Sequence, residues 1–249
     1  MTFGVIDLAA ILIAFALAAI VKGAIGVGTP LIAVPLLSTR LGLPETITLL
    51  TIPLVVGNCW HVWEYRSARR DLRFLPSFLI CAGAGVGIGT WGLVSLDPAP
   101  LRVGIGIMVL IYLATTLALP NLTLSHIAGR KLAPLVGAGS GILQGMTGIS
   151  APISLTYLSA LQLTRPQFIL SASSVFLTFA LIQSVTLSLA GIMTLKLLAL
   201  SAMAAGVMPV FLPLGGVLGR RISPKVFRQI VLALLLVLAV RMIHQGISL

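Results

Sequence analysis

Two glycine-rich stretches that each end in proline, residues 23–30 (GAIGVGTP) and 145–152 (GMTGISAP), have the clearest chemical pattern in the sequence. Proline suits the first turn of a helix, where no backbone hydrogen bond is lost, and glycine lets the main chain break or approach a ligand. The free amide groups at a helix start attract anions. Each stretch therefore predicts a chain break and a helix start, with the residues just before the proline capping the first turn. Together the two helix starts are expected to bind one small anion near mid-membrane.

Polar side chains near the two stretches complete the predicted anion site. Lys22 would add positive charge, although a lysine that extends to the membrane surface is an equally good interpretation. Single glycines are often packing contacts between membrane helices, but the duplicated pattern favours a site. Helix hydroxyls often bond to their own backbone, so Asn58 and the Thr51/Ser173 pair are preferred among the polar residues of the following segments. The predicted substrate-binding residues are Lys22, Gly26, Gly28, Thr29, Thr51, Asn58, Gln144, Thr147, Gly148, Ser150 and Ser173.

A second cluster, His61 and Glu64, lies beside Trp60 and Trp63. These residues could handle a proton, but an aromatic belt at the membrane surface with ordinary polar neighbours is the favoured interpretation. The sequence has no metal-ligand spacing, no nucleophile motif and no phosphate-binding glycine loop of the Walker type. We therefore expect no enzyme activity, no catalytic residues, no cofactor and no metal.

The composition shows which kind of element must position these residues. Of the 249 residues, 58% are hydrophobic and 8% are charged, which is too little polar surface for a water-soluble protein of this size. The net charge is +11, and the basic residues lie in short gaps between apolar runs. They therefore indicate loops that set membrane topology and contact lipid headgroups, and not a nucleic-acid partner. A small anion and membrane lipid are the expected partners, and a homodimer is left open.

Ten apolar segments predict membrane helices, beginning with a first span near the N-terminus and not a cleaved signal. Three of them, which begin at Pro30, Leu132 and Pro152, have only about 12 residues, and such short segments indicate half-helices or a re-entrant hairpin. The segments are 6–21, 30–41, 44–63, 74–96, 101–119, 132–143, 152–163, 167–190, 197–218 and 227–244.

The two halves of the chain are related. Glycine and proline positions 23, 26, 30 and 44 recur as the same residue types 122 positions later, and a pattern around Pro98 recurs at an offset of 126. This duplication predicts two transmembrane repeats, residues 1–122 and 123–249. Each repeat would be a broken pair of short helices followed by three longer helices.

The basic residues indicate how each broken pair runs. If each pair formed one continuous span, the basic residues outside Lys22 would divide 8 against 7 between the two sides. If each pair enters the membrane and returns to the same side, the basic residues divide 11 against 4, as the positive-inside rule requires. This arrangement predicts inverted-topology repeats with both termini outside the cytoplasm. The cytoplasmic set would be Arg66, Arg69, Arg70, Arg73, Arg130, Lys131, Arg165, Arg220, Arg221, Lys225 and Arg228.

The two broken pairs, together with the glycine runs 85–89 and 215–219, resemble the TauE/SafE sulfite exporter family over nearly the whole chain. The resemblance implies a duplicated, multi-pass protein of the inner membrane that moves sulfite, sulfonates such as sulfoacetate, or related anions. Thr29 and the Ser150-Ala151 pair stand where further glycines are typical of the family. These residues would touch the ligand, so the resemblance leaves the identity of the anion open.

Three other functions remain open on the sequence. One is a permease for another small organic anion such as a carboxylate, another is a cation permease, and a third is a membrane assembly or signalling protein that transports nothing. The scarcity of acidic residues speaks against a cation. Export of a monoanion needs no coupling ion, because an inside-negative potential drives it outward by about 2.3 kcal/mol per 100 mV.

Overall fold

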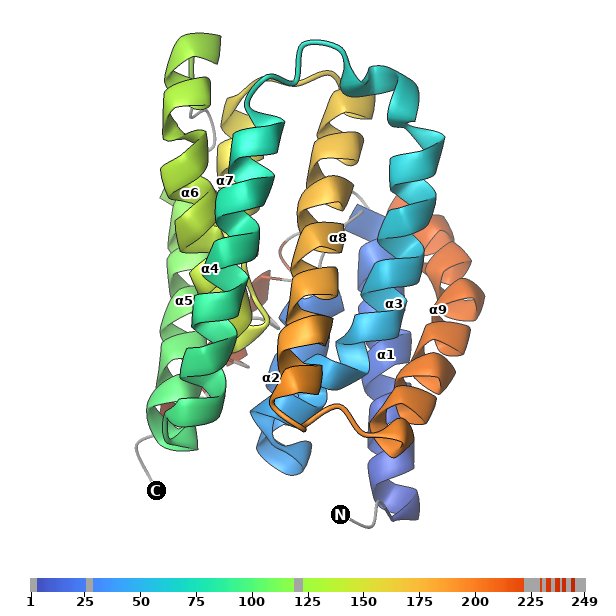
Figure 1. Ribbon diagram of the computed structural model, residues 1–249. Coiled ribbons are helices and arrows are strands. Elements are labelled where there is room, and N and C mark those ends of the chain that lie inside the picture. Colours follow the sequence, from blue (N-terminus) through green and yellow to red (C-terminus); the bar gives the residue numbers. More distant parts are fainter. Residues whose placement is uncertain are drawn as a thin grey trace. The chain divides into compact units, whose positions relative to one another are not determined.

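The computed structural model describes residues 4–25, 29–118 and 123–221, with single positions between 229 and 244. Within these residues the chain forms helices and connecting turns. The predicted segment 227–244 lies largely outside the described residues. The elements are α1 (Val5–Ile25), α2 (Thr29–Leu41), α3 (Leu43–Glu64), the short 3-10 helix η1 (Arg66–Arg69), α4 (Leu75–Ser95), α5 (Pro98–Ala118), α6 (His126–Thr147), α7 (Ala151–Ala160), α8 (Arg165–Leu189) and α9 (Leu195–Arg221) (Figure 1).

Five of the described helices, α1, α3, α4, α8 and α9, are long and apolar enough to cross a bilayer. An apolar helix of about 20 residues satisfies its own backbone and spans the hydrocarbon core. The protein is therefore an all-α membrane protein with several such helices, as the composition predicts.

The predicted length of the segment 132–143 is wrong. It is part of α6, which has 22 residues. The helix begins earlier because Ser125 caps it, its side chain accepting a hydrogen bond from the amide of Ala128 at 3.3 Å. It also continues through the polar Gln144 to Thr147. The apolar run alone stops at polar residues that the helix includes, whereas α2 and α7, with 13 and 10 residues, are short as predicted.

The chain forms two compact units, and each draws on both halves of the sequence. Unit 1 comprises Met1–Pro53, Asp97–Leu113 and Ile192–Leu249, and so holds α1, α2 and α9. Unit 2 comprises Leu54–Leu96 and Ala114–Gly191, and so holds α4, α6, α7 and α8. Compact units and sequence repeats are different divisions of a chain, so the repeat boundary at residue 122 stays a prediction. Each unit is described separately below.

In unit 2, α4 and α6 lie side by side in backbone contact (Figure 1). A Cβ atom on Gly145 of α6 would overlap the carbonyl oxygen of Val86 and the amide nitrogen of Thr90 in α4. A Cβ on Gly89 of α4 would overlap the carbonyl oxygen of Ile142 in α6. Small residues allow this close approach, which stabilises helix pairs in membranes through dense packing.

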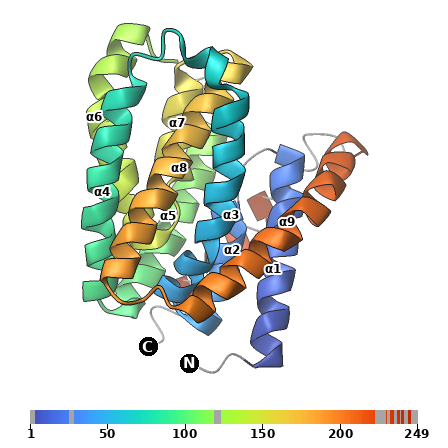
Figure 2. The same cartoon turned by 45° about the vertical axis from the view of Figure 1, so that its right-hand side comes forward.

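The same contacts occur in unit 1 between α1 and α9 (Figure 2). A Cβ on Gly23 would overlap the carbonyl oxygen of Leu212, and a Cβ on Gly215 would overlap that of Ile20. These four residues correspond to Ile142, Gly145, Val86 and Gly89 of the α4–α6 pair at the offsets of 122 and 126 found in the sequence. Equivalent glycines thus touch equivalent carbonyls, and the two helix pairs share one packing register.

Also in unit 1, a side chain of α9 supplies a hydrogen bond that α3 lacks. Pro53 lies inside α3 and has no N–H group, so the carbonyl of Leu49, four residues earlier, loses its usual helix partner. The hydroxyl of Ser201 donates to that carbonyl oxygen at 2.9 Å and accepts a hydrogen bond from the amide of Ile52 at 3.1 Å. Ser201 therefore repairs the backbone of α3 at the proline.

We expect Ser201→Ala to lower the stability of the protein by about 1–2 kcal/mol, because a buried carbonyl is left without a donor. Pro53→Ala restores an N–H at position 53, so the serine should matter less in that background. Melting temperatures of the two single variants and the double variant measure this coupling. Additive effects of the two substitutions would contradict the repair role of Ser201.

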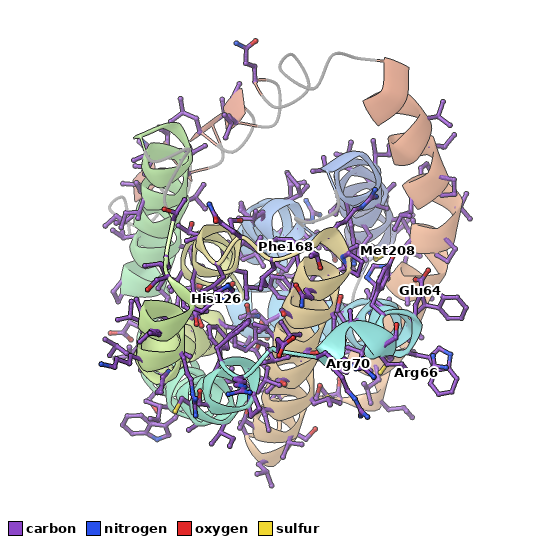
Figure 3. All side chains as sticks on the ribbon, turned by 90° about the horizontal axis from the view of Figure 1, so that it is seen from above. Glu64, Arg66, Arg70, His126, Phe168 and Met208 are labelled. Carbon is purple, nitrogen blue, oxygen red and sulfur yellow. The ribbon has the colours of Figure 1, made fainter. Side chains whose placement is uncertain are left out.

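Basic residues gather at one end of unit 2. The side-chain amide of Gln167 at the start of α8 donates to the carbonyl of Arg70 at 3.2 Å, which joins the α8 start to the turn after α3. Figure 3 looks onto this end and labels Arg66, Arg70 and His126. The guanidinium of Arg66 lies 4.3 Å from the ring centre of the exposed Trp63, an arrangement typical of a membrane surface. The basic residues on these connected segments are Arg66, Arg69, Arg70, Arg73 and Arg165, and Arg130 and Lys131 lie in the second turn of α6, which begins at His126.

Candidate functional site

The break between α6 and α7 in unit 2 begins at a glycine in the left-handed conformation. Gly148 has φ 72°, and its amide donates to the carbonyl of Gln144 at 2.8 Å, which ends α6. Only glycine adopts this conformation without steric cost, so the sequence dictates the stop. The Thr147 hydroxyl then holds the turn by donating to the carbonyl of Leu143 at 2.8 Å and accepting from the amide of Ile149 at 3.1 Å.

Helices α6 and α7 run in opposite directions. The amide of Leu124, just before α6, donates to the carbonyl of Ala160 at the end of α7 at 2.7 Å. The hydroxyl of Tyr157 donates to the carbonyl of Gly129 at 2.8 Å. Ten residues of α7 rise about 15 Å, about half the ~30 Å hydrocarbon thickness of a bilayer. The start of α7 is therefore about 15 Å from the end of this hairpin at which α6 begins and α7 ends.

Unit 1 has a comparable fold-back. The Arg40 guanidinium at the end of α2 forms an ion pair with the Asp7 carboxylate near the start of α1, with 2.6 Å between Nε and Oδ1. Thr29 is the first residue of α2 and is only 1% exposed, and its hydroxyl has no hydrogen-bond partner among the described residues. Lys22 lies in the last turn of α1. Two predicted site residues, Gly26 and Gly28, lie outside the described residues.

Ser150 immediately precedes α7 but does not cap it, which corrects the prediction that the residues just before the proline cap the turn. A capping side chain bonds to the N–H two or three positions on. Pro152 at the second position has no N–H, and the Ile153 N–H donates to the backbone carbonyl of Ser150 at 3.0 Å. The Ser150 hydroxyl consequently has no partner within the part of the chain that the structure describes, and Ser150 is 1% exposed.

A pair of buried glutamine side chains closes the end of α6. Gln183 on α8 donates through Nε2 to two backbone carbonyls, those of Gln144 at 3.3 Å and Gly145 at 3.1 Å. The last carbonyls of a helix lack the usual helical donors. Gln183 supplies a donor to the Gly145 carbonyl and a second donor to the Gln144 carbonyl, which already accepts from the Gly148 amide. The Nε2 group of Gln144 donates in turn to Oε1 of Gln183 at 3.2 Å.

Sequence reasoning treated Gln183 as one polar residue among several in α8 and missed this role. Its partner is 39 residues away, and no local spacing predicts that contact. The available signal is energetic: an amide side chain in an apolar membrane helix is costly unless it has a partner. Gln183 is 3% exposed, which is consistent with that reasoning.

The other predicted residues lie on helices around these features. The side-chain amide of Asn58 donates to the Leu54 carbonyl of its own helix at 2.7 Å. Thr51 lies on α3 in unit 1, and Ser173 lies on α8 in unit 2. Both side chains are buried, and nothing in the structure tests their contact with a ligand.

The predicted proton-handling pair lies at the end of α3. The ring of His61 packs edge-on against Tyr65 with 6.4 Å between ring centres, and Glu64 is exposed. Trp60 and Trp63 are also exposed. Within the described residues, no group of three or more His, Cys, Asp or Glu side chains could hold a metal ion.

Each broken pair thus presents a helix start with a buried hydroxyl that has no partner, Thr29 in unit 1 and Ser150 in unit 2. A helix start and a free hydroxyl are both donors to an anion. Comparison with known families decides the context: the family model described as Sulfite exporter TauE/SafE matches residues 11–242. The chain belongs to the TauE/SafE family.

The TauE/SafE match covers both broken pairs, as the resemblance in the sequence implies. A search of curated proteins and a search of solved structures gave no match. The description of this family names sulfite export.

Proposed function

We propose that the protein exports a small sulfur-containing anion, such as sulfite or a sulfonate, across the inner membrane and binds it at the helix breaks. The observation that carries this proposal is the Ser150 hydroxyl, buried without a partner at the start of α7 in a TauE/SafE chain. A buried hydroxyl without a partner costs free energy that a bound anion would recover. The positive end of the α7 dipole adds attraction for negative charge.

The proposal assigns a matching role to the first break. Thr29 at the start of α2 has the same unpartnered, buried hydroxyl, and Lys22 precedes that break. We propose that each break offers these donors to an anion near mid-membrane, as broken helices do in transporters built from inverted repeats. The shared glycine packing of the α4–α6 and α1–α9 pairs supports the duplication on which this assignment rests.

We further propose that the repeats have inverted topology, with the basic end of unit 2 in the cytoplasm. Both broken pairs fold back, through the Asp7–Arg40 ion pair in one and the Leu124–Ala160 hydrogen bond in the other. Fold-back is the arrangement that gives the 11 to 4 distribution of basic residues. The bond between Gln167 and Arg70 supports the placement of Arg165 on the side of the 66–73 loop.

The test is sulfite efflux from cells or vesicles that contain the full chain. We expect Ser150→Ala to reduce flux about tenfold, since a lost hydrogen bond to a charged group is worth about 1.5–3 kcal/mol. Lys22→Ala should also reduce flux. The matched control is Ser154→Ala, one turn later, because the Ser154 hydroxyl already donates to the Ser150 carbonyl of its own helix at 2.9 Å. Unchanged flux in both Lys22→Ala and Ser150→Ala would remove the proposed site.

A further inference from the structure

The glutamine pair at the end of α6 forms a hydrogen-bond chain with a fixed direction. It starts at the backbone carbonyls of Gln144 and Gly145, which can only accept hydrogen bonds. Gln183 must therefore turn its Nε2 group toward them, at 3.3 and 3.1 Å. Its Oε1 then faces Gln144 and needs a donor, which Nε2 of Gln144 supplies at 3.2 Å.

This order determines the free end of the chain. The oxygen and nitrogen of a glutamine amide are assigned from their hydrogen bonds, and here the assignment follows from carbonyls that cannot flip. Exchanging the two atoms of either amide would place oxygen against oxygen. The remaining atom is Oε1 of Gln144, a pure acceptor. It has no partner among the residues that the structure describes, and Gln144 is 3% exposed.

The break thus combines two chemistries within seven residues of sequence. The Ser150 hydroxyl and the start of α7 donate hydrogen bonds and suit negative charge. The Gln144 oxygen accepts a hydrogen bond and repels the oxygens of a fully deprotonated anion. A ligand that satisfies both must be an anion with a hydrogen-bond donor of its own.

We infer that the protein selects anions that carry an O–H or N–H group, with this group donating to Oε1 of Gln144. For sulfite the bound species is the hydrogen-bearing monoanion, and for sulfonates it is a hydroxy- or amino-sulfonate. This inference rests on the proposed function, because it concerns the ligand of the same break. It adds a selection rule that neither net charge nor the family match supplies.

Two sulfonates of nearly the same size and the same charge test the inference. The probes are 2-hydroxyethanesulfonate, which has a donor, and propane-1-sulfonate, which has a methyl group in its place. Each is added to the purified full chain, and the concentration for half-maximal thermal stabilisation is measured, with sulfite as a third probe. We expect the hydroxy compound to bind about tenfold or more tightly, because a buried acceptor is left unpaired by the other.

Substitutions assign the preference to its residue. Gln144→Met keeps the side-chain length but removes the acceptor, and we expect it to abolish the preference between the two sulfonates. The matched control Ser184→Ala, next to Gln183 on α8, should keep the preference because the Ser184 hydroxyl bonds to the Ala180 carbonyl of its own helix.

The outcomes separate the inference from the proposed function. If sulfite binds, three results overturn the inference and leave the proposed function standing. The two sulfonates could bind with equal affinity, or 2-hydroxyethanesulfonate could fail to bind. The preference between them could also survive in Gln144→Met. Failure of sulfite and both sulfonates to stabilise the protein overturns the proposed function as well.

Discussion

Replacing Gly145 by alanine is expected to destabilise the protein by about 1–3 kcal/mol, because the added methyl group meets backbone and not a flexible side chain. A Cβ there would overlap the Val86 carbonyl and the Thr90 amide of α4, so the two helices must separate. The melting temperature of the purified protein should fall by about 2–4 °C for each kcal/mol.

The control for this substitution is Gly139→Ala on the same helix. No atom of the described residues lies within 4 Å of a Cβ at Gly139, so this variant should keep or raise the melting temperature, as alanine favours helix over glycine. Equal melting of the two variants would show that α4 and α6 are not in backbone contact.

Replacing Gln183 by leucine is expected to have a still larger effect, about 2–4 kcal/mol. A single hydrogen bond between membrane helices contributes ~0.6 kcal/mol on average. Here the Gly145 carbonyl and the side-chain amide of Gln144 both lose the partner that Gln183 supplies. The Gln144 carbonyl loses a second donor and keeps the Gly148 amide. Buried polar groups left unpaired cost about 1–3 kcal/mol each before the structure relaxes.

Both stability and sulfite flux should fall in Gln183→Leu, since the end of α6 adjoins the proposed anion site. The matched control is Thr186→Val, because the Thr186 hydroxyl bonds to the Ile182 carbonyl of its own helix at 3.0 Å. A Gln183→Leu protein that melts and transports like the unmodified one would show that the break needs no support from α8.

The sequence predicts the helical class well because apolar runs and proline-glycine breaks report directly on membrane insertion. The sequence also gives the offsets that relate the glycine contacts of the α1–α9 pair to those of the α4–α6 pair. Gly23 and Gly145 are packing contacts between helices, the alternative to a ligand site, since both meet backbone carbonyls of a neighbouring helix. The length of α6 was not predictable from hydropathy, because its ends are polar.

The candidate site was predictable in part. Glycine and proline types locate the break at Gly148, and the conformation there follows from residue type. The free Ser150 hydroxyl depends on how Ile153 uses its amide, and the glutamine chain depends on a contact between distant helices. Both are products of three-dimensional packing, which local sequence patterns do not encode.

The repair of α3 by Ser201 has a consequence for biosynthesis. Ser201 follows Leu49 by 152 residues, so the ribosome completes α3 long before its missing donor exists. A nascent chain that ends before α9 carries an uncovered carbonyl at the proline, which hydrocarbon tolerates poorly. We therefore expect this carbonyl of α3 to remain beside water, a lipid headgroup or the insertion machinery until α9 is made. Unit 1 would then assemble only after α9 has been translated.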